Sequence, residues 1–98
     1  MACVIQLVVL LYAGPEGLSG LREYESQLIP VLREYGGELL SASRNTAIDS
    51  GPDEIHVIQF SHQDQFEAYQ KDERVQQLRT KREQYIARKV AFLTNEFH

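Results

Sequence analysis

The sequence predicts an α+β domain with four strands and two helices in the order β-α-β-β-α-β. Three observations support this prediction. The stretch from Asp53 to Tyr69 passes from a strand pattern directly into a helix start, residues 18–35 carry apolar side chains three or four apart, and Val4 to Leu11 is an apolar run of strand length. With 98 residues and a hydrophobic fraction of 43%, the chain forms a single domain, residues 1–98.

The first strand is expected at about Val4 to Tyr12, ended by Gly14 and Pro15. The first helix is expected from about Leu18 to Tyr35, with a mild kink at Pro30, which lacks a backbone donor. Gly36-Gly37 ends this helix by supplying a residue in the left-handed conformation. The apolar positions of the helix form one buried stripe: Leu18, Leu21, Tyr24, Leu28, Leu32 and Tyr35.

The second half of the chain begins with a short strand at about Glu38 to Arg44. After a polar turn, a third strand follows at about Glu54 to Phe60, rich in β-branched and aromatic residues. Ser61 is the predicted N-cap of the next helix, and Asp64 places a carboxylate in its first turn.

The second helix is expected to start near His62, lose its apolar stripe from Gln70 to Glu73, and resume it as far as Ile86. The last strand is expected at about Val90 to Phe97. This order is the split β-α-β arrangement of ferredoxin-like folds. Right-handed crossovers are expected to place strands one and three side by side and parallel, with strands two and four at the edges and both helices on one face.

The second face of the sheet predicts a homodimer. Only Gln6 is polar between Val4 and Leu11, so the first strand is apolar on both sides. A domain of this size has no further element to cover the second face, and several hundred Å² of exposed apolar sheet would represent on the order of 10 kcal/mol of unrealised burial. A second copy of the same sheet, related by a two-fold axis, is the expected cover.

Composition narrows the function classes. A net charge of −4 argues against nucleic acid as the main partner. The run from Val4 to Ala13 is too short for a membrane helix; it could instead be a signal peptide, but nothing basic precedes Val4. Cys3 is the only cysteine, so no internal disulfide or thiolate cluster can form, and a reducing cytoplasm fits best.

Charge is unevenly distributed along the chain. Five basic residues and one acidic residue give residues 79–89 a net charge of +4. Two interpretations remain open. The cations form a solvated helix face near a C-terminal end, where the helix dipole favours them, or they form a rim that attracts anions.

Two sequence segments carry a resemblance to a known superfamily. They are Tyr35 to Leu40, with the sequence Tyr-Gly-Gly-Glu-Leu-Leu, and the run from Ile58 through Phe66 and Tyr69 to Asp72. The chain resembles the dimeric α/β-barrel superfamily, near small uncharacterised members and antibiotic-biosynthesis monooxygenase-like members. The resemblance implies two ferredoxin-like sheets meeting face to face, with any site in a cleft between the helices and the sheet. The superfamily includes cofactor-free monooxygenases, lactone isomerases, haem-handling enzymes and proteins of unassigned activity, so the fold does not select a reaction.

Most familiar catalytic motifs are absent from the sequence. There is no glycine-rich phosphate loop and no Gly-x-Ser-x-Gly elbow. His56, His62 and His98 form no i, i+4 pair and have no nearby cysteine. The sequence therefore predicts no cofactor and no metal site.

His56 is the candidate catalytic residue. His56 and Gln6 are each third in a strand, and if those strands are parallel neighbours the two side chains lie side by side on one face. Thr94 and Asn95, late in the last strand, would reach the same level. Either His56 and Gln6 satisfy each other or the partner subunit as buried polar groups, or neutral His56 is a general base for an acidic phenol or enol.

The candidate ligand-binding residues are Gln6, Tyr12, Tyr69 and Arg82. Tyr12 and Tyr69 would line a flat cleft for an aromatic molecule, and Arg82 would hold a carboxylate at its mouth. The alternative places the tyrosines in the core and the stem of Arg82 over Leu78 and Ile86.

Two function classes follow. One is a protein that binds a small aromatic or enolisable molecule, as a cofactor-free monooxygenase or isomerase would. The other is a non-catalytic dimeric module with an interior filled by side chains. An open cavity of at least ~300 Å³ reaching His56 separates the two classes.

Overall fold

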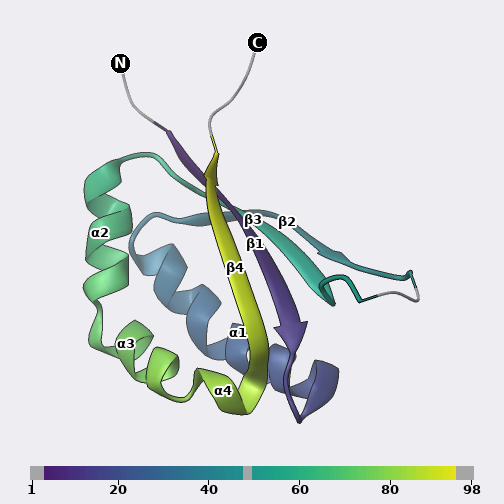
Figure 1. Ribbon diagram of the computed structural model, residues 1–98. Helices are drawn as coiled ribbons and strands as arrows, with labels where there is room; N and C mark the ends of the chain where they lie inside the picture. The colour runs from purple at the N-terminus through teal and green to yellow at the C-terminus, as the bar shows by residue number, and fades with distance from the viewer. Residues whose placement is uncertain (1–3, 48–49, 95–98) are drawn as a thin grey trace.

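The computed structural model describes residues 4–47 and 50–94, which form a four-stranded antiparallel sheet with helices packed on one face (Figure 1). The sheet order is β2-β3-β1-β4, so strands two and four are the edges, as predicted. None of the helices in these residues is both long enough and apolar enough to cross a membrane. The elements are β1 Ile5–Ala13, α1 Gly17–Glu34, β2 Glu38–Arg44, β3 Glu54–Phe60, α2 Gln63–Lys71, α3 Glu73–Thr80, α4 Arg82–Tyr85 and β4 Ile86–Thr94.

The predicted direction of one strand pair is wrong. Strands β1 and β3 are neighbours but run antiparallel, with Val9 opposite His56 and Gln6 opposite Gln59. Strand β2 is also antiparallel to β3, so β1 and β2 run in the same direction without being neighbours. The crossover through α1 joins these two strands and leaves a gap that β3 fills from the opposite direction.

The end of α1 is formed by the glycine pair that the sequence indicated. Gly36 has a φ of 80°, the left-handed conformation that glycine adopts without steric cost. The Gly36 N–H donates to the carbonyl of Arg33, and the Gly37 N–H donates to the carbonyl of Leu32, each at 3.0 Å. Pro30 lies inside the helix, as expected.

The second helical region is three short helices instead of one. The break lies at Asp72, whose backbone is extended and whose Oδ1 accepts a hydrogen bond from the Arg74 N–H at 2.8 Å. The Tyr35 hydroxyl donates to the same carboxylate at 2.7 Å, which ties the break to the end of α1. The loss of the apolar stripe between Gln70 and Glu73 marks this break in the sequence.

Strand β4 begins at Ile86, four residues earlier than predicted. Ile86 continues the apolar spacing of the preceding helix, but it is buried as the first residue of a strand. The carbonyl of Tyr85 accepts a hydrogen bond from Gly14 at 3.0 Å, which directs the chain into the sheet. The predicted end of this strand, at Phe97, lies outside the described residues.

The sequence suggested Ser61 as the N-cap of α2, and this prediction is wrong. The backbone remains extended at His62, which is the N-cap, and the helix begins at Gln63. The Oε1 atom of Gln65 accepts hydrogen bonds from the backbone N–H groups of Ser61 and His62, at 3.1 and 3.2 Å. A glutamine at the third helical position thus supplies the cap.

The two faces of the sheet have different covers. Ile5, Val9 and Leu11 of β1 are buried against the helices, in two apolar clusters that also contain Leu21, Leu32 and Phe60. Because side chains alternate along a strand, Val8 faces the opposite side, together with Val57 and Phe92, which lie across from it on β3 and β4. Phe92 is 50% exposed. We call this uncovered side the open face.

Candidate functional site

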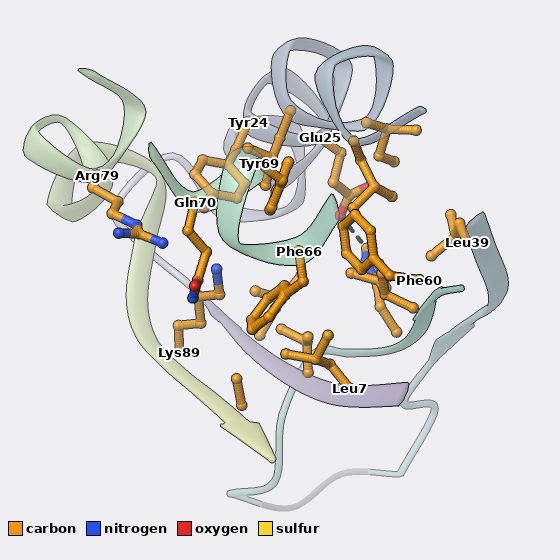
Figure 2. Close-up of a pocket in the computed structure, with 18 of the residues that line it drawn as sticks. Leu7, Tyr24, Glu25, Leu39, Phe60, Phe66, Tyr69, Gln70, Arg79 and Lys89 are labelled. Atoms are coloured by element: carbon orange, nitrogen blue, oxygen red, sulfur yellow. Dashed lines mark ion pairs between the residues drawn. The ribbon is translucent and has the colours of Figure 1, made fainter. Parts of the chain in front are cut away.

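A cavity of about 430 Å³ lies between the sheet and the helices (Figure 2). All four helices contribute to its walls, and residues from all four strands line its floor. His56 lines the cavity, whose volume exceeds the ~300 Å³ that small-molecule sites require. The apolar part of the lining includes Leu7, Val9, Leu11, Leu28, Phe60 and Phe66.

One wall carries a buried cluster of two carboxylates and an imidazole. The Nε2 atom of His56 lies 3.2 Å from Oε1 of Glu54 and 3.5 Å from Oε2 of Glu25. Glu54 and His56 are two apart on β3 and point to the same side, whereas Glu25 comes from α1. Arg22, one turn before Glu25, forms ion pairs with both carboxylates. In Figure 2, the dashed line beside Glu25 marks its pair with His56.

The two carboxylates have pKa values displaced in opposite directions. Burial, and then the adjacent Glu54 carboxylate, raise the pKa of Glu25 to about 7, although Arg22 opposes the shift. Burial alone would also raise the pKa of Glu54, but hydrogen bonds with Glu25, Arg22 and His56 outweigh it and lower that pKa to about 2. Glu54 is therefore ionised at neutral pH, whereas Glu25 titrates close to neutral pH.

Glu25 is the group of this cluster that is best placed to exchange a proton. Its side chain is only 13% exposed, and its Oε2 atom has no hydrogen bond within residues 4–47 and 50–94. In contrast, the Nε2 atom of His56 is already held by the Glu54 carboxylate. A buried carboxyl with a pKa near the working pH, at the wall of a cavity, has the properties of a general acid or base.

The same three side chains could also coordinate a cation. Glu25, Glu54 and His56 each offer one ligand atom, and these three atoms lie within 4.8 Å of one another. Arg22 already supplies positive charge to both carboxylates, so a metal ion would have to compete with its guanidinium group.

The opposite wall carries positive charge. Arg79 from α3, Arg82 from α4 and Lys89 from β4 all line the cavity, together with the amide side chain of Gln70 from α2. The ammonium of Lys89 lies 5.9 Å from the centre of the Tyr24 ring. Figure 2 shows Arg79 and Lys89 on the side of the cavity away from Glu25.

The structure brings together three of the five predicted site residues. His56, Tyr69 and Arg82 line the cavity. Tyr69 packs edge to face against Tyr35 and tilted against Phe60, with ring centres 6.4 and 5.5 Å apart, and burial raises its hydroxyl pKa, so it stays neutral.

Gln6 and Tyr12 do not share this site, contrary to the sequence interpretation. Gln6 lies on the open face, where its amide donates to Oε1 of Gln59 at 3.0 Å. Tyr12 is also on that face, with the Arg88 guanidinium 5.3 Å from its ring centre. The reason is the antiparallel pairing of β1 and β3, which places Gln6 opposite Gln59 and separates it from His56 by the thickness of the sheet.

Strand β4 meets Gln6 as expected. Thr94 lies across from Gln6, and its hydroxyl donates to the Gln6 carbonyl at 3.5 Å. This level is on the open face, not at the cavity. Asn95 lies outside the described residues.

Sequence reasoning missed Glu25 and Glu54, although both left a signal, and it gave Arg79 and Lys89 only as part of a basic segment that could form an anion-attracting rim. Glu25 follows Leu21 by four residues and precedes Leu28 by three, so it is a carboxylate on the buried stripe of α1. Glu54 precedes His56 by two residues and therefore shares its side of the strand. The position of Lys89 depends on where β4 begins, which the pattern placed too late.

Comparison with known proteins identifies a family and a fold. The sequence model of a domain of unknown function, DUF1330, matches residues 16–95. A search of curated proteins finds no match.

Solved structures with the same fold differ strongly in sequence. A protein of unknown function from Rhodopseudomonas palustris is 12% identical, with a TM-score of 0.80 over 100% of this chain and 85% of that one. A candidate antibiotic biosynthesis monooxygenase from Caulobacter crescentus is 11% identical, with a TM-score of 0.78 over 99% and 92%. A dimeric protein of unknown function with a ferredoxin-like fold, from Bacteroides fragilis, is 7% identical, with a TM-score of 0.70 over 95% and 96%. At these identities the likeness establishes the ferredoxin-like fold alone.

Proposed function

This chain belongs to the DUF1330 family, and for this member we propose that it binds a small aromatic or enolisable organic molecule in the cavity and moves a proton on it. The observation that carries the proposal is the Glu25 carboxyl: buried, without a hydrogen bond on Oε2, and with a pKa raised to about 7 at the cavity wall. Such a group can both accept and return a proton near neutral pH.

The reaction that fits this geometry best is an isomerisation through an enolate. Ionised Glu25 takes a proton from a carbon beside a carbonyl group, and the electron pair of the broken C–H bond moves into the enolate. The Glu25 carboxylic acid then returns the proton to a different carbon, so no electrons are gained or lost overall. His56 and Arg22 position the carboxylate, and ionised Glu54 holds His56 in turn.

A cofactor-free monooxygenase would begin with the same step. Deprotonation of a phenol or enol gives an electron-rich anion that reacts with molecular oxygen, so the proton acceptor is required in either case. The structural neighbour named as a candidate antibiotic biosynthesis monooxygenase supports this second reaction only by analogy of fold. The Oε2 atom of Glu25, which lies 3.5 Å from His56 Nε2 but has no hydrogen bond within the described residues, supports proton removal, which the two reactions share.

The second part of the proposal is a homodimer formed through the open face. Val8, Val57 and Phe92 form an apolar centre on a side of the sheet that none of the described helices covers. A structural neighbour with a ferredoxin-like fold is described as dimeric. The alternative function, a non-catalytic dimeric module, calls for an interior filled by side chains, and the 430 Å³ cavity favours the binding protein instead.

Hydrogen–deuterium exchange into a ligand tests the proton-transfer step directly. The protein is incubated in D₂O with aryl ketones such as 4-acetylbenzoate, and NMR follows the loss of the methyl proton signal. We expect catalysed exchange by the parent protein and a fall of at least ~100-fold in Glu25→Gln, the usual scale of general base catalysis. Glu23→Gln, the same substitution at an exposed position of α1, should exchange at the parent rate. Equal exchange by Glu25→Gln and the parent would remove Glu25 from the mechanism.

A further inference from the structure

Three cations at the cavity form no ion pair with a carboxylate among the described side chains. Arg79, Arg82 and Lys89 form no ion pair with any described side chain, although Arg22 and Arg74 elsewhere are each paired with two carboxylates. They come from three elements, α3, α4 and β4, and converge on one wall. A convergence of like charges costs free energy unless an anion offsets it.

Lys89 distinguishes this wall from a solvated helix face. Arg79 and Arg82 are exposed, as cations at a cavity mouth would be, but Lys89 is partly buried on the helix-covered side of β4. Burial, followed by the charges of Arg79 and Arg82, lowers the pKa of its ammonium group to about 8. The two arginines are thus close enough to Lys89 to lower the pKa of its ammonium group. An anion between the three groups would offset the repulsion among them.

The sheet register sets the distance between this wall and the proton acceptor. Lys89 pairs with Leu11 on β1, and Leu11 pairs with Glu54 on β3, so the three residues form one row across the sheet. Two strand spacings give about 10 Å between the backbones of β4 and β3. Between them the floor is apolar, with Leu11 and Val9 at its centre.

We propose that Arg79, Arg82 and Lys89 bind the carboxylate of a small organic acid whose enolisable or phenolic end points toward Glu25. The proposal rests on the proposed function, and it specifies the substrate class and its orientation. Guanidinium groups match the planar carboxylate with paired hydrogen bonds, and Gln70 adds an amide to the lining of the same cavity. An aromatic ring or short apolar segment would separate the two ends of the ligand and cover Leu11 and Val9.

Matched ligands test the charge requirement by titration calorimetry. The acid 4-acetylbenzoate has a carboxylate at one end and an enolisable acetyl group at the other, and 4-acetylbenzamide has nearly the same shape without the charge. We expect the parent protein to bind the acid at least about tenfold more tightly than the amide, as expected for the loss of a charged hydrogen bond. Phenyl phosphate serves as the competing anion and should bind more weakly than 4-acetylbenzoate.

Substitutions then assign the charge to its residues. Lys89→Gln and Arg79→Gln should each weaken binding of 4-acetylbenzoate about tenfold and leave binding of the amide unchanged. Lys71→Gln, the same charge loss at an exposed position of α2, is the control and should bind both ligands like the parent. A circular dichroism spectrum shows that each variant is folded.

Several results would overturn the inference. These are equal binding of acid and amide by the parent, no binding of any anionic probe at millimolar concentration, tighter binding of phenyl phosphate, or parent-like binding of the acid by both cation variants. The proton-transfer proposal fails separately. If 4-acetylbenzoate binds through the three cations but its methyl protons do not exchange, the anion site stands and the proposed reaction does not.

Discussion

The two faces of the sheet differ in a way that reverses the usual relation between charge and burial. The helix-covered face holds ionised and titratable groups, including Glu25, Glu54 and Lys89, around a cavity. The open face has an apolar centre around Val8, with polar pairs such as Gln6 and Gln59 toward one end. Charged groups are retained in an interior when they serve a ligand or each other, and an apolar exposed sheet is retained when it has a partner.

The largest expected effect follows from placing a charge on the open face. In the proposed dimer, Val8→Asp would bury a carboxylate between two sheets, so we expect it to abolish the dimer or unfold the chain, at a cost of several kcal/mol. Sedimentation velocity at micromolar concentration measures whether the variant and the parent are dimers or monomers. Leu18→Asp, the same kind of change at an exposed position of α1, should leave assembly intact. A parent protein that sediments as a stable monomer would show that the two faces differ for another reason.

A smaller effect is expected on the cavity side, where the stability should depend on pH through Glu25. Its pKa is raised in the folded protein, so the folded state holds more protons than the unfolded state between about pH 4.5 and 7. The contribution of Glu25 to stability therefore falls as pH rises through this window, by up to about 3 kcal/mol.

Glu25→Gln should remove this part of the pH dependence. Urea unfolding midpoints at pH 5 and pH 8.5, compared between parent and variant, isolate it from the other titrating groups. Glu23→Gln provides the matched control and should follow the parent at both values. Parallel profiles for Glu25→Gln and the parent would mean that Glu25 titrates as an ordinary exposed carboxyl.

The smallest expected effect concerns α2, which covers part of the cavity face. Gln65→Ala removes the acceptor for the N–H groups of Ser61 and His62, so it should lower the free energy of unfolding by about 1 kcal/mol. Ser61→Ala should change it by only a few tenths of a kcal/mol. Equilibrium denaturation compares the two variants. A larger loss for Ser61→Ala would restore Ser61 as the cap.

The order of elements and the edge strands were predictable because they depend on local patterns. The apolar stripe of α1, the Gly36 turn and the β-branched run of β3 each act within a few residues. The direction of β1 against β3 depends on contacts between distant segments, and an error there moved Gln6 to the wrong face. The same limit left the anion-attracting rim at residues 79–89 as one of two interpretations, because Arg79, Arg82 and Lys89 meet only after the helical region breaks at Asp72 and β4 starts at Ile86.

The break at Asp72 also links ligand binding to folding stability. Helices α2 and α3 have nine and eight residues, shorter than the ~12–15 that an isolated helix needs, so their helical state depends on packing against α1 and the sheet. A molecule that fills the cavity adds contacts to Phe66 of α2 and Arg79 of α3 at once. A ligand present at 100 times its dissociation constant would stabilise the fold by about 2.7 kcal/mol. If the cavity binds a small organic acid as proposed, the melting temperature reports that binding, and a thermal-shift screen of small organic acids tests it without knowledge of the reaction.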